Sequence, residues 1–177
     1  MEIKTSQNGE NLLIQNTLIV SKMKNKIKNY QNLEKILSEL PNGSIIVGGF
    51  IRDLILERIS PYPDIDIVIP KNSLEIGQNI ANKFSGKFLI LDQDRNIVRI
   101  IFRNFIIDIA NQTHELLAED LRTRDFTINS IGFSYEQGKL IDPSNGIYDL
   151  NNSLLRSLRT ENLLYDPLRI LRCFRFA

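Results

Sequence analysis

The stretch that determines the fold runs from Ser44 to Pro70 and reads Ser-Ile-Ile-Val-Gly-Gly-Phe-Ile-Arg-Asp-Leu-Ile-Leu-Glu-Arg-Ile-Ser-Pro-Tyr-Pro-Asp-Ile-Asp-Ile-Val-Ile-Pro. Its β-branched start, 44–47, predicts a short strand. The pair Gly48-Gly49 predicts a turn, because glycine adopts backbone angles that other residues resist. An apolar helical turn follows, two prolines interrupt the chain, and alternating residues at 64–69 predict a second strand.

The second strand carries two carboxylates on one face. Its period of two places Asp64 and Asp66 on one side and Ile65 and Ile67 on the other. Two such carboxylates repel each other unless a cation lies between them or one is protonated. Mg²⁺ usually takes a carboxylate or two together with substrate phosphates. The pattern therefore points to a magnesium site, with two solvent-facing aspartates on an edge strand as the alternative.

The glycine turn precedes a helix that carries Arg52 and Asp53. Backbone N–H groups at Gly48 and Gly49, together with the positive end of a helix, attract an anion. A plain tight turn is the alternative, and short motifs are weak when they stand alone. In this order the two features predict a phosphate cradle beside a metal-binding pair, with Asp53 bracing the turn.

The same residues resemble a known family. Gly48-Gly49-Phe50-Ile51-Arg52-Asp53, followed by Asp64-Ile65-Asp66, is similar to the pattern Gly-Gly-x-Val-Arg-Asp and Asp-x-Asp in the head domain of class II tRNA nucleotidyltransferases and bacterial poly(A) polymerases. The resemblance extends from about Gly43 to Ala177. It implies an α/β (α+β) nucleotidyltransferase fold of the DNA polymerase beta type. The expected parts are an N-terminal extension (1–25), a head domain (26–160) and the start of a helical neck (161–177).

Composition narrows the class of protein. Of 177 residues, 42% are hydrophobic and 24% charged, which is typical of a soluble globular domain with a core. The formal net charge of +1 means that RNA affinity must come from a local patch. One cysteine, Cys173, excludes an internal disulfide and favours a reducing, cytoplasmic location. The single histidine, His114, cannot build a zinc site with one cysteine. No apolar run reaches the length of a membrane span.

Periodicity predicts the other elements. Residues 1–25 are expected to form a loose extension or a short helix, and helices are predicted at 26–40 and 73–84. Three β-branched and aromatic runs predict a meander, which with the first two strands makes a mixed five-stranded sheet with helices packed on one side. The three runs predict strands at 87–91, 97–102 and 105–110. The later predicted elements are a helix capped by Thr113, a hairpin at 133–141, a capped turn at 142–150 and a short strand at 154–158.

An acid, Asp108, interrupts the apolar run 105–110. A buried carboxylate is costly unless it is paired or bound to metal. The pattern leaves a metal ligand and a salt bridge to a nearby arginine equally open. The family has a third carboxylate on the strand beside the Asp-x-Asp strand. The resemblance therefore implies two Mg²⁺ ions held by Asp64 and Asp66, with Asp108 completing one site.

Residues 121–130, Leu-Arg-Thr-Arg-Asp-Phe-Thr-Ile-Asn-Ser, resemble the family motif Arg-Arg-Asp-Phe-Thr-Ile-Asn-Ala. Thr123 stands where the first arginine is usual. The match implies that Arg124, Asp125 and Asn129 hold the ribose and triphosphate of the incoming nucleotide. An Arg–Asp pair that ties a helix end to the sheet is the alternative, and both roles can hold together.

The C-terminal segment begins with Asp166, a predicted helix N-cap followed by a proline. The family motif Glu-Asp-x-x-Arg assigns base recognition to Asp166 and Arg169, although Tyr165 replaces the glutamate. Arg172 shares a helical face with Arg169 and joins the predicted nucleotide-binding set. A capped helix with a solvated basic face is the alternative.

The resemblance implies transfer of C and/or A from CTP or ATP to the 3′ end of tRNA, with release of pyrophosphate. Gly48, Gly49 and Arg52 would hold the triphosphate, and such reactions need no Ser, Cys or His nucleophile. A poly(A) polymerase and a non-catalytic nucleotide- or RNA-binding fragment are the alternatives.

The last helix is expected to be cut off in mid-course, because no stop signal follows 169–177. It would then expose Leu171, Phe174 and Phe176. An apolar patch of that kind normally contacts a partner, so dimerisation, aggregation or poor stability is expected, and a homodimer through this helix is one such outcome.

Overall fold

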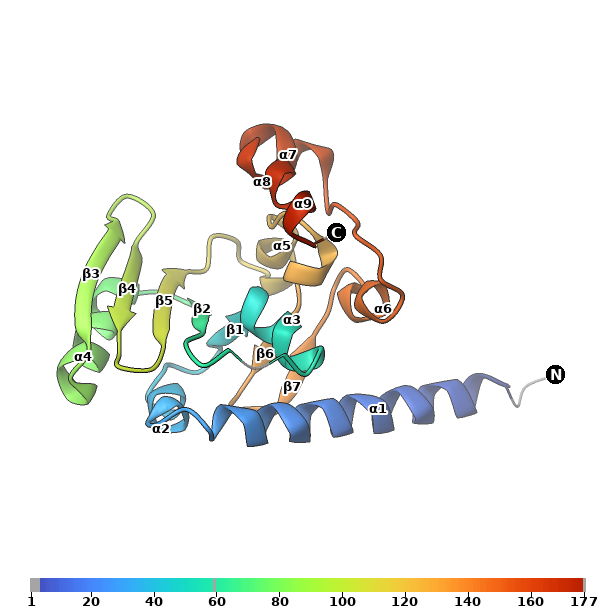
Figure 1. Ribbon diagram of the computed structural model, residues 1–177, viewed down its shortest axis with the longest axis horizontal. Helices are drawn as coiled ribbons and strands as arrows, with labels where there is room; N and C mark the ends of the chain where they lie inside the picture. The colour runs from blue at the N-terminus through green and yellow to red at the C-terminus, as the bar shows by residue number, and fades with distance from the viewer. Residues whose placement is uncertain (1–3, 59, 177) are drawn as a thin grey trace.

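The computed structural model describes residues 4–58 and 60–176. Within them, seven strands form one mixed sheet in the order β3-β4-β5-β2-β1-β6-β7 (Figure 1). Neighbouring strands pair antiparallel, except that β2 and β5 run parallel. The strands are β1 (Ile45–Val47), β2 (Asp64–Ile69), β3 (Lys87–Asp92), β4 (Ile97–Ile101), β5 (Ile106–Asn111), β6 (Gly132–Ser134) and β7 (Lys139–Ile141).

The five strands predicted for the sheet are all present, but the predicted strand number was too low. The hairpin β6–β7, which was predicted separately, joins the sheet because β6 pairs with β1 through Ile46 and Phe133. Gly132 permits this close approach, since a Cβ there would lie 2.8 Å from the Ile45 side chain. The strand predicted at 154–158 is wrong: within it, Ser157 makes an isolated bridge to Phe126.

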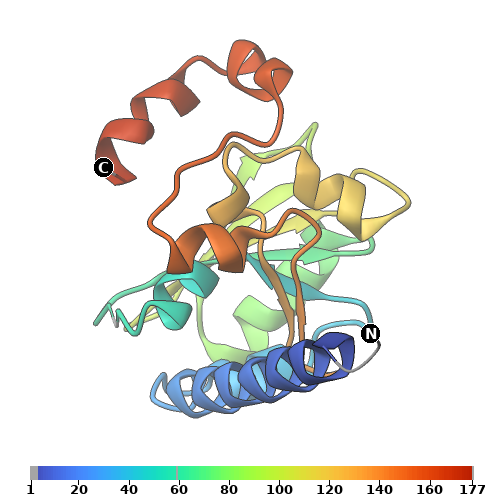
Figure 2. The ribbon, with the colours of Figure 1, turned by 90° about the vertical axis from the view of Figure 1, so that its right-hand side faces the viewer.

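One face of the sheet is covered by α1 (Lys4–Ile27), α2 (Leu33–Ser38) and α4 (Ser73–Phe84), which lie on the same side (Figures 1 and 2). The alternate residues of β2, β4 and β5 point to these helices and are buried in one core cluster. Each large apolar side chain buried there contributes about 1.5–3 kcal/mol relative to exposure. The opposite face is left open over β4, β5 and the start of β2.

The prediction of one helix over 26–40 is wrong at its centre. Helix α1 ends at Ile27 and α2 begins only at Leu33. Asn32, just before α2, has a φ of 69°, a left-handed conformation that an α-helix cannot continue through. Residues 4–27 form one long helix rather than a loose extension or a short helix, and Met23 and Ile27 bury their side chains fully in the core.

The other helices are α3 (Gly49–Ile55), α5 (Leu117–Arg122), α6 (Gly146–Asn151), α7 (Thr160–Tyr165), α8 (Leu168–Leu171) and α9 (Cys173–Phe176). Helix α3 packs its buried residues into the same core cluster as α1, α2 and α4, whereas α5 packs Leu121 against Val47 and Val68 on the other face. The predicted capped turn before α6 is confirmed, since the Asp142 carboxylate accepts the N–H groups of Gly146 and Ile147 at 2.7 and 2.9 Å. No helix in the described ranges is long and apolar enough to cross a membrane.

Candidate active site

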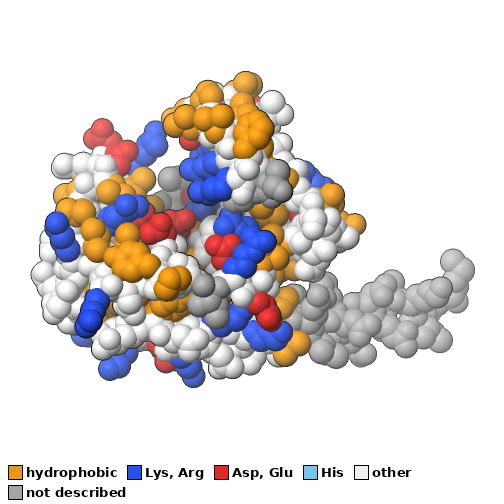
Figure 3. Space-filling view, viewed as in Figure 1, with side chains coloured by type: hydrophobic (Ala, Val, Ile, Leu, Met, Phe, Trp, Pro, Cys, Tyr) orange, Lys and Arg blue, Asp and Glu red, His pale blue; other side chains and the backbone are white. Residues whose placement is uncertain are grey.

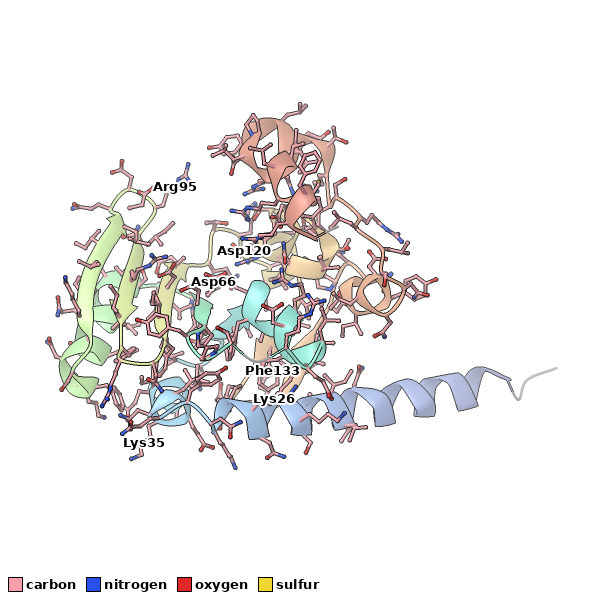
Figure 4. All side chains as sticks on the ribbon, in the orientation of Figure 1. Lys26, Lys35, Asp66, Arg95, Asp120 and Phe133 are labelled. Carbon is pink, nitrogen blue, oxygen red and sulfur yellow. The ribbon has the colours of Figure 1, made fainter. Side chains whose placement is uncertain are left out.

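A row of charged side chains crosses the open face of the sheet. Asp66 on β2 is the register partner of Val47 on β1 and of Asp108 on β5, and Asp108 is the partner of Arg99 on β4. Asp64 lies two residues before Asp66 and shares its face. Figure 4 shows Asp66 on the side of the sheet away from α1, below the C-terminal helices.

Most of the predicted site residues surround one pocket of about 660 Å³. The space-filling view shows basic and acidic side chains around this hollow, with hydrophobic side chains over the C-terminal helices above it (Figure 3). The predicted residues that line it are Gly48, Gly49, Arg52, Asp64, Asp66, Asp108, Arg124, Asp125, Asn129, Arg169 and Arg172. Asp166 is the one predicted site residue that is not among them.

The environment of Asp66 favours a bound cation. Burial raises the pKa of Asp66, and the charges of Asp108 and Asp64 raise it further, while Arg124 opposes them. A desolvated carboxylate between two others is stabilised when a cation joins them. The described residues include no cluster of three His, Cys, Asp or Glu side chains that could hold a metal ion. The carboxylates of Asp64 and Asp66 are oxygen ligands of the kind that Mg²⁺ takes, and this ion needs few protein ligands when a substrate phosphate completes its shell.

Asp108 forms the salt bridge that the sequence had left open. Its two carboxylate oxygens accept the Nε and Nη2 hydrogens of Arg99, both at 2.8 Å. These hydrogen bonds, which Arg99 donates to Asp108, raise the pKa of Arg99. Arg99 was not predicted as a site residue, although an arginine alone in the apolar strand Ile97–Ile101 was the available signal.

Replacing Arg99 by glutamine is expected to destabilise the protein by about 1–3 kcal/mol, because a half-buried carboxylate loses its bidentate partner beside Asp66. Urea unfolding measures this loss, and the double variant Arg99→Gln/Asp108→Asn should recover most of it. Arg95→Gln is the matched control, since its pair with Asp92 is exposed and 3.6 Å long. Equal losses in Arg99→Gln and Arg95→Gln would contradict the role of this ion pair.

Gly48 brings the backbone directly against the charged groups. Its φ of 77° and ψ of −142° form a conformation that is essentially restricted to glycine. A Cβ at Gly48 would lie 2.9 Å from Asp66 Oδ2 and 3.0 Å from Arg124 Nη1. The turn that follows is braced as expected, because Arg52 donates to Asp53 Oδ1 at 2.9 Å and to Asn129 Oδ1 at 2.8 Å.

Arg124 and Asp125 have different surroundings. Arg124 is half-buried, and its guanidinium makes no hydrogen bond or ion pair with another described residue; burial lowers its pKa, while the charge of Asp66 opposes that shift. Burial alone would raise the pKa of Asp125, but hydrogen bonds from Asn129, the Phe126 N–H group and Arg172 lower it overall. The Arg172 bond, 2.9 Å long, is an ion pair that ties the C-terminal segment to the wall of the pocket.

The predicted base-reading pair is only partly in place. Pro167, not Asp166, occupies the N-cap position of α8, because the helix begins one residue later than expected. The Asp166 carboxylate still accepts the Leu168 N–H group at 3.2 Å and lies 3.6 Å from the Arg169 Nε atom. Arg169 also donates to the Thr123 carbonyl at 2.8 Å, so its guanidinium is held against the pocket.

Thr113 does not cap α5, which begins at Leu117 with Leu116 in the N-cap position. Instead the Thr113 N–H and hydroxyl groups both donate to Asp120 Oδ1, at 2.8 and 2.7 Å. Asp120 is buried, lines the pocket and points toward the same region as Asp66 (Figure 4). Sequence reasoning missed Asp120, because the bond joins residues seven apart across a loop.

Together, an aspartate pair on a central strand, a glycine turn at the end of the next strand and arginines around the shared pocket define a nucleotidyltransferase head. Comparison with known proteins agrees. Residues 44–156 match the family described as the poly(A) polymerase head domain, and the chain belongs to this family.

The chain is similar to several tRNA nucleotidyltransferases and to a solved CCA-adding enzyme. The chain is 40% identical over 141 residues to a CC-adding tRNA nucleotidyltransferase from Synechocystis sp., which covers 80% of this chain and 34% of that protein. It is 30% identical over 164 residues to an A-adding tRNA nucleotidyltransferase from Halalkalibacterium halodurans, covering 83% and 38%. A solved CCA-adding enzyme with CTP is similar at a TM-score of 0.75 and 33% identity, covering 89% and 41%. The chain thus spans about a third of the length of these curated relatives.

Proposed function

We propose that this chain is the head of an enzyme that transfers C and/or A from CTP or ATP to the 3′ end of tRNA and releases pyrophosphate. The observation that carries the proposal is the single pocket in which Asp64, Asp66, Gly48 and Arg124 meet. The relatives named CC-adding and A-adding tRNA nucleotidyltransferases support the choice of substrate.

The carboxylates of Asp64 and Asp66 would hold Mg²⁺, and Asp108 would complete one metal site through oxygen lone pairs that its bond to Arg99 does not use. When bound, two such ions lower the pKa of an attacking hydroxyl and neutralise the leaving pyrophosphate. We assign the triphosphate to the wall formed by Gly48, Gly49 and Arg124. Transfer of this kind depends on positioning and charge neutralisation, so no covalent nucleophile is required.

Four further side chains would position this nucleotide-binding wall and take no direct part in the reaction: Arg52, Asp125, Asn129 and Arg172. Asn129 accepts from Arg52 and donates to Asp125, which in turn accepts from Arg172. This chain of bonds fixes the position of the nucleotide-binding wall before the nucleotide arrives, and such preorganisation contributes to rate.

The family name also makes a poly(A) polymerase a candidate. Primer extension on tRNA transcripts that end at different 3′ positions separates the possibilities. Addition of one to three nucleotides and then a stop supports tRNA repair, and a long ladder supports the polymerase. Nucleotide binding without any extended product would leave a non-catalytic nucleotide- or RNA-binding fragment and overturn the proposal.

Base choice is proposed to depend on Asp166 and Arg169. Cytosine and adenine both present an exocyclic amine beside a ring-nitrogen acceptor, which match a carboxylate acceptor and a guanidinium donor. A site that hydrogen-bonds a base edge rejects bases that leave its polar groups unpaired. Asp166→Ala and Arg169→Ala are therefore expected to relax the preference for C and A about 10-fold or more.

Single-nucleotide incorporation with each of the four NTPs measures this preference. Arg159→Ala is the control, because Arg159 pairs with Glu119 and does not line the pocket. Unchanged selectivity in both test variants would move base recognition away from α8.

The proposal keeps the division into an extension (1–25), a head (26–160) and the start of a neck (161–177), although α1 continues through the first boundary. We also propose that the enzyme is cytoplasmic. A homodimer through the C-terminal helices is also proposed, since Leu171 and Phe174 are 61% and 80% exposed. The Phe176 side chain lies outside the described residues.

A further inference from the structure

We infer that Tyr62 and Arg58 form the subsite for the last nucleotide of the RNA acceptor, with the Tyr62 ring as a stacking platform for its base. This inference rests on the proposed function and assigns the second substrate of the reaction to a particular wall of the pocket. Both residues line the pocket and belong to the loop between α3 and β2.

The two walls of the pocket lie on opposite sides of the aspartate pair. Gly48 and Arg124 approach Asp66 from the β1 side. The loop that carries Tyr62 lies on the β5 side, because the Pro63 carbonyl accepts the Ile106 N–H group at 3.0 Å. An in-line transfer needs the attacking hydroxyl and the leaving pyrophosphate on opposite sides of the phosphorus. With the triphosphate on the β1 side, the acceptor belongs on the β5 side.

The Tyr62 ring is held in place without a bound partner. Its hydroxyl donates to the Phe102 carbonyl at 3.1 Å, and its N–H group donates to Ser60 Oγ at 3.2 Å. The prolines on either side, Pro61 and Pro63, restrict the backbone around it. A fixed ring loses little conformational freedom when a base stacks on it.

The exposure of Tyr62 distinguishes it from the other aromatic residues that line the pocket. Tyr30 and Phe50 also line it, but each is only 6% exposed, whereas Tyr62 is 44% exposed. Every base has a face that stacks on such a ring, so a platform tolerates different terminal bases. That property suits an acceptor whose last base changes with each added nucleotide.

Arg58 supplies a charge for the acceptor backbone. The chain turns there because Glu57 has a φ of 59°, and Glu57 is held by an ion pair of 2.7 Å with Lys22 on α1. Arg58 itself is exposed, and its side chain makes no hydrogen bond or ion pair with another described residue. An available guanidinium at the mouth of the pocket fits a phosphate of single-stranded RNA.

The test uses a tRNA transcript that lacks its CCA end and carries 2-aminopurine as its last base, a probe whose fluorescence falls on stacking. Tyr62→Ala is expected to weaken binding of this RNA about 5- to 100-fold and to abolish the quenching, because the stacked ring is lost. Tyr62→Phe should keep most of both. Tyr148→Ala is the control, since Tyr148 is exposed on α6 and does not line the pocket.

The same variants separate the two substrates in steady-state kinetics. We expect Tyr62→Ala to raise the KM for the RNA and to leave the KM for CTP and ATP unchanged. Arg58→Gln should weaken RNA binding and reduce its salt slope by about 0.7. A raised KM for the nucleotide with unchanged RNA binding would instead place Tyr62 against the incoming base and overturn the inference, as would unaltered RNA binding and quenching in Tyr62→Ala.

The fluorescence measurement needs no turnover, so the two claims can fail separately. If wild-type protein quenches the probe through Tyr62 but transfers no nucleotide, the proposed function fails and the acceptor subsite stands. If wild-type protein transfers nucleotides and Tyr62→Ala binds the RNA normally, the subsite fails and the proposed function stands.

Discussion

Replacing Asp66 by asparagine is expected to lower nucleotide transfer about 1,000-fold or more, because a metal-binding carboxylate contributes several kcal/mol to the transition state. The fold should survive. Burial raises the pKa of Asp66, with the charges of Asp108 and Asp64 adding to the shift and Arg124 opposing it. The ionised side chain therefore disfavours the folded state, and the asparagine removes that cost.

The pH dependence of stability gives this prediction a second measure. A carboxyl whose folded pKa is raised contributes stability below its ordinary value of 3.8 and loses that contribution as the pH rises through the raised pKa. Urea unfolding of Asp66→Asn should lack this loss. Asp94→Asn is the control, since Asp94 is exposed in the turn between β3 and β4. Near-normal turnover in Asp66→Asn would show that the metal site lies elsewhere.

Replacing Gly48 by alanine is expected to reduce transfer about 100-fold or more and to weaken nucleotide binding, because misplacing the positioning groups by an ångström has effects of that size. The added Cβ would lie 2.9 Å from Asp66 Oδ2 and 3.0 Å from Arg124 Nη1, so both groups must move. The substitution also strains the backbone, which by itself costs about 1–3 kcal/mol of stability.

Gly43→Ala separates strain from site geometry. Gly43 has a φ of 85°, also left-handed, but a Cβ there would meet only the Pro70 ring, at 3.4 Å. Thermal unfolding should show a loss of stability in both variants, whereas transfer and CTP binding should fall only in Gly48→Ala. Equal activity in the two variants would mean that the close approach at Gly48 is structural.

Local patterns were sufficient for much of this fold. The alternation in 64–69 placed Asp64 and Asp66 on one face, and the glycine turn fell where β1 ends. Both features depend on residues close in sequence. The addition of β6 and β7 to the sheet depends on the pairing of Ile46 with Phe133, which no local pattern encodes.

The site could be predicted as a set of residues but not as a set of contacts. Asp108 was recognised as an unusual acid in an apolar strand, yet its bond to Arg99 follows from the register of β4 and β5. The break at Asn32 depends on a left-handed backbone angle that asparagine permits but does not require. Tyr62 carries no motif, and its position follows from a hydrogen bond to a residue 40 positions away.

The most direct test of the central claim is the product balance of one turnover. Wild-type protein is mixed with Mg²⁺, α-labelled CTP or ATP, and a tRNA transcript that lacks its 3′ CCA. We predict that one pyrophosphate is released for each nucleotide joined to the RNA, and that Asp66→Asn suppresses both products together. Release of orthophosphate from the nucleotide, with no label joined to the RNA, would contradict nucleotidyl transfer at this pocket.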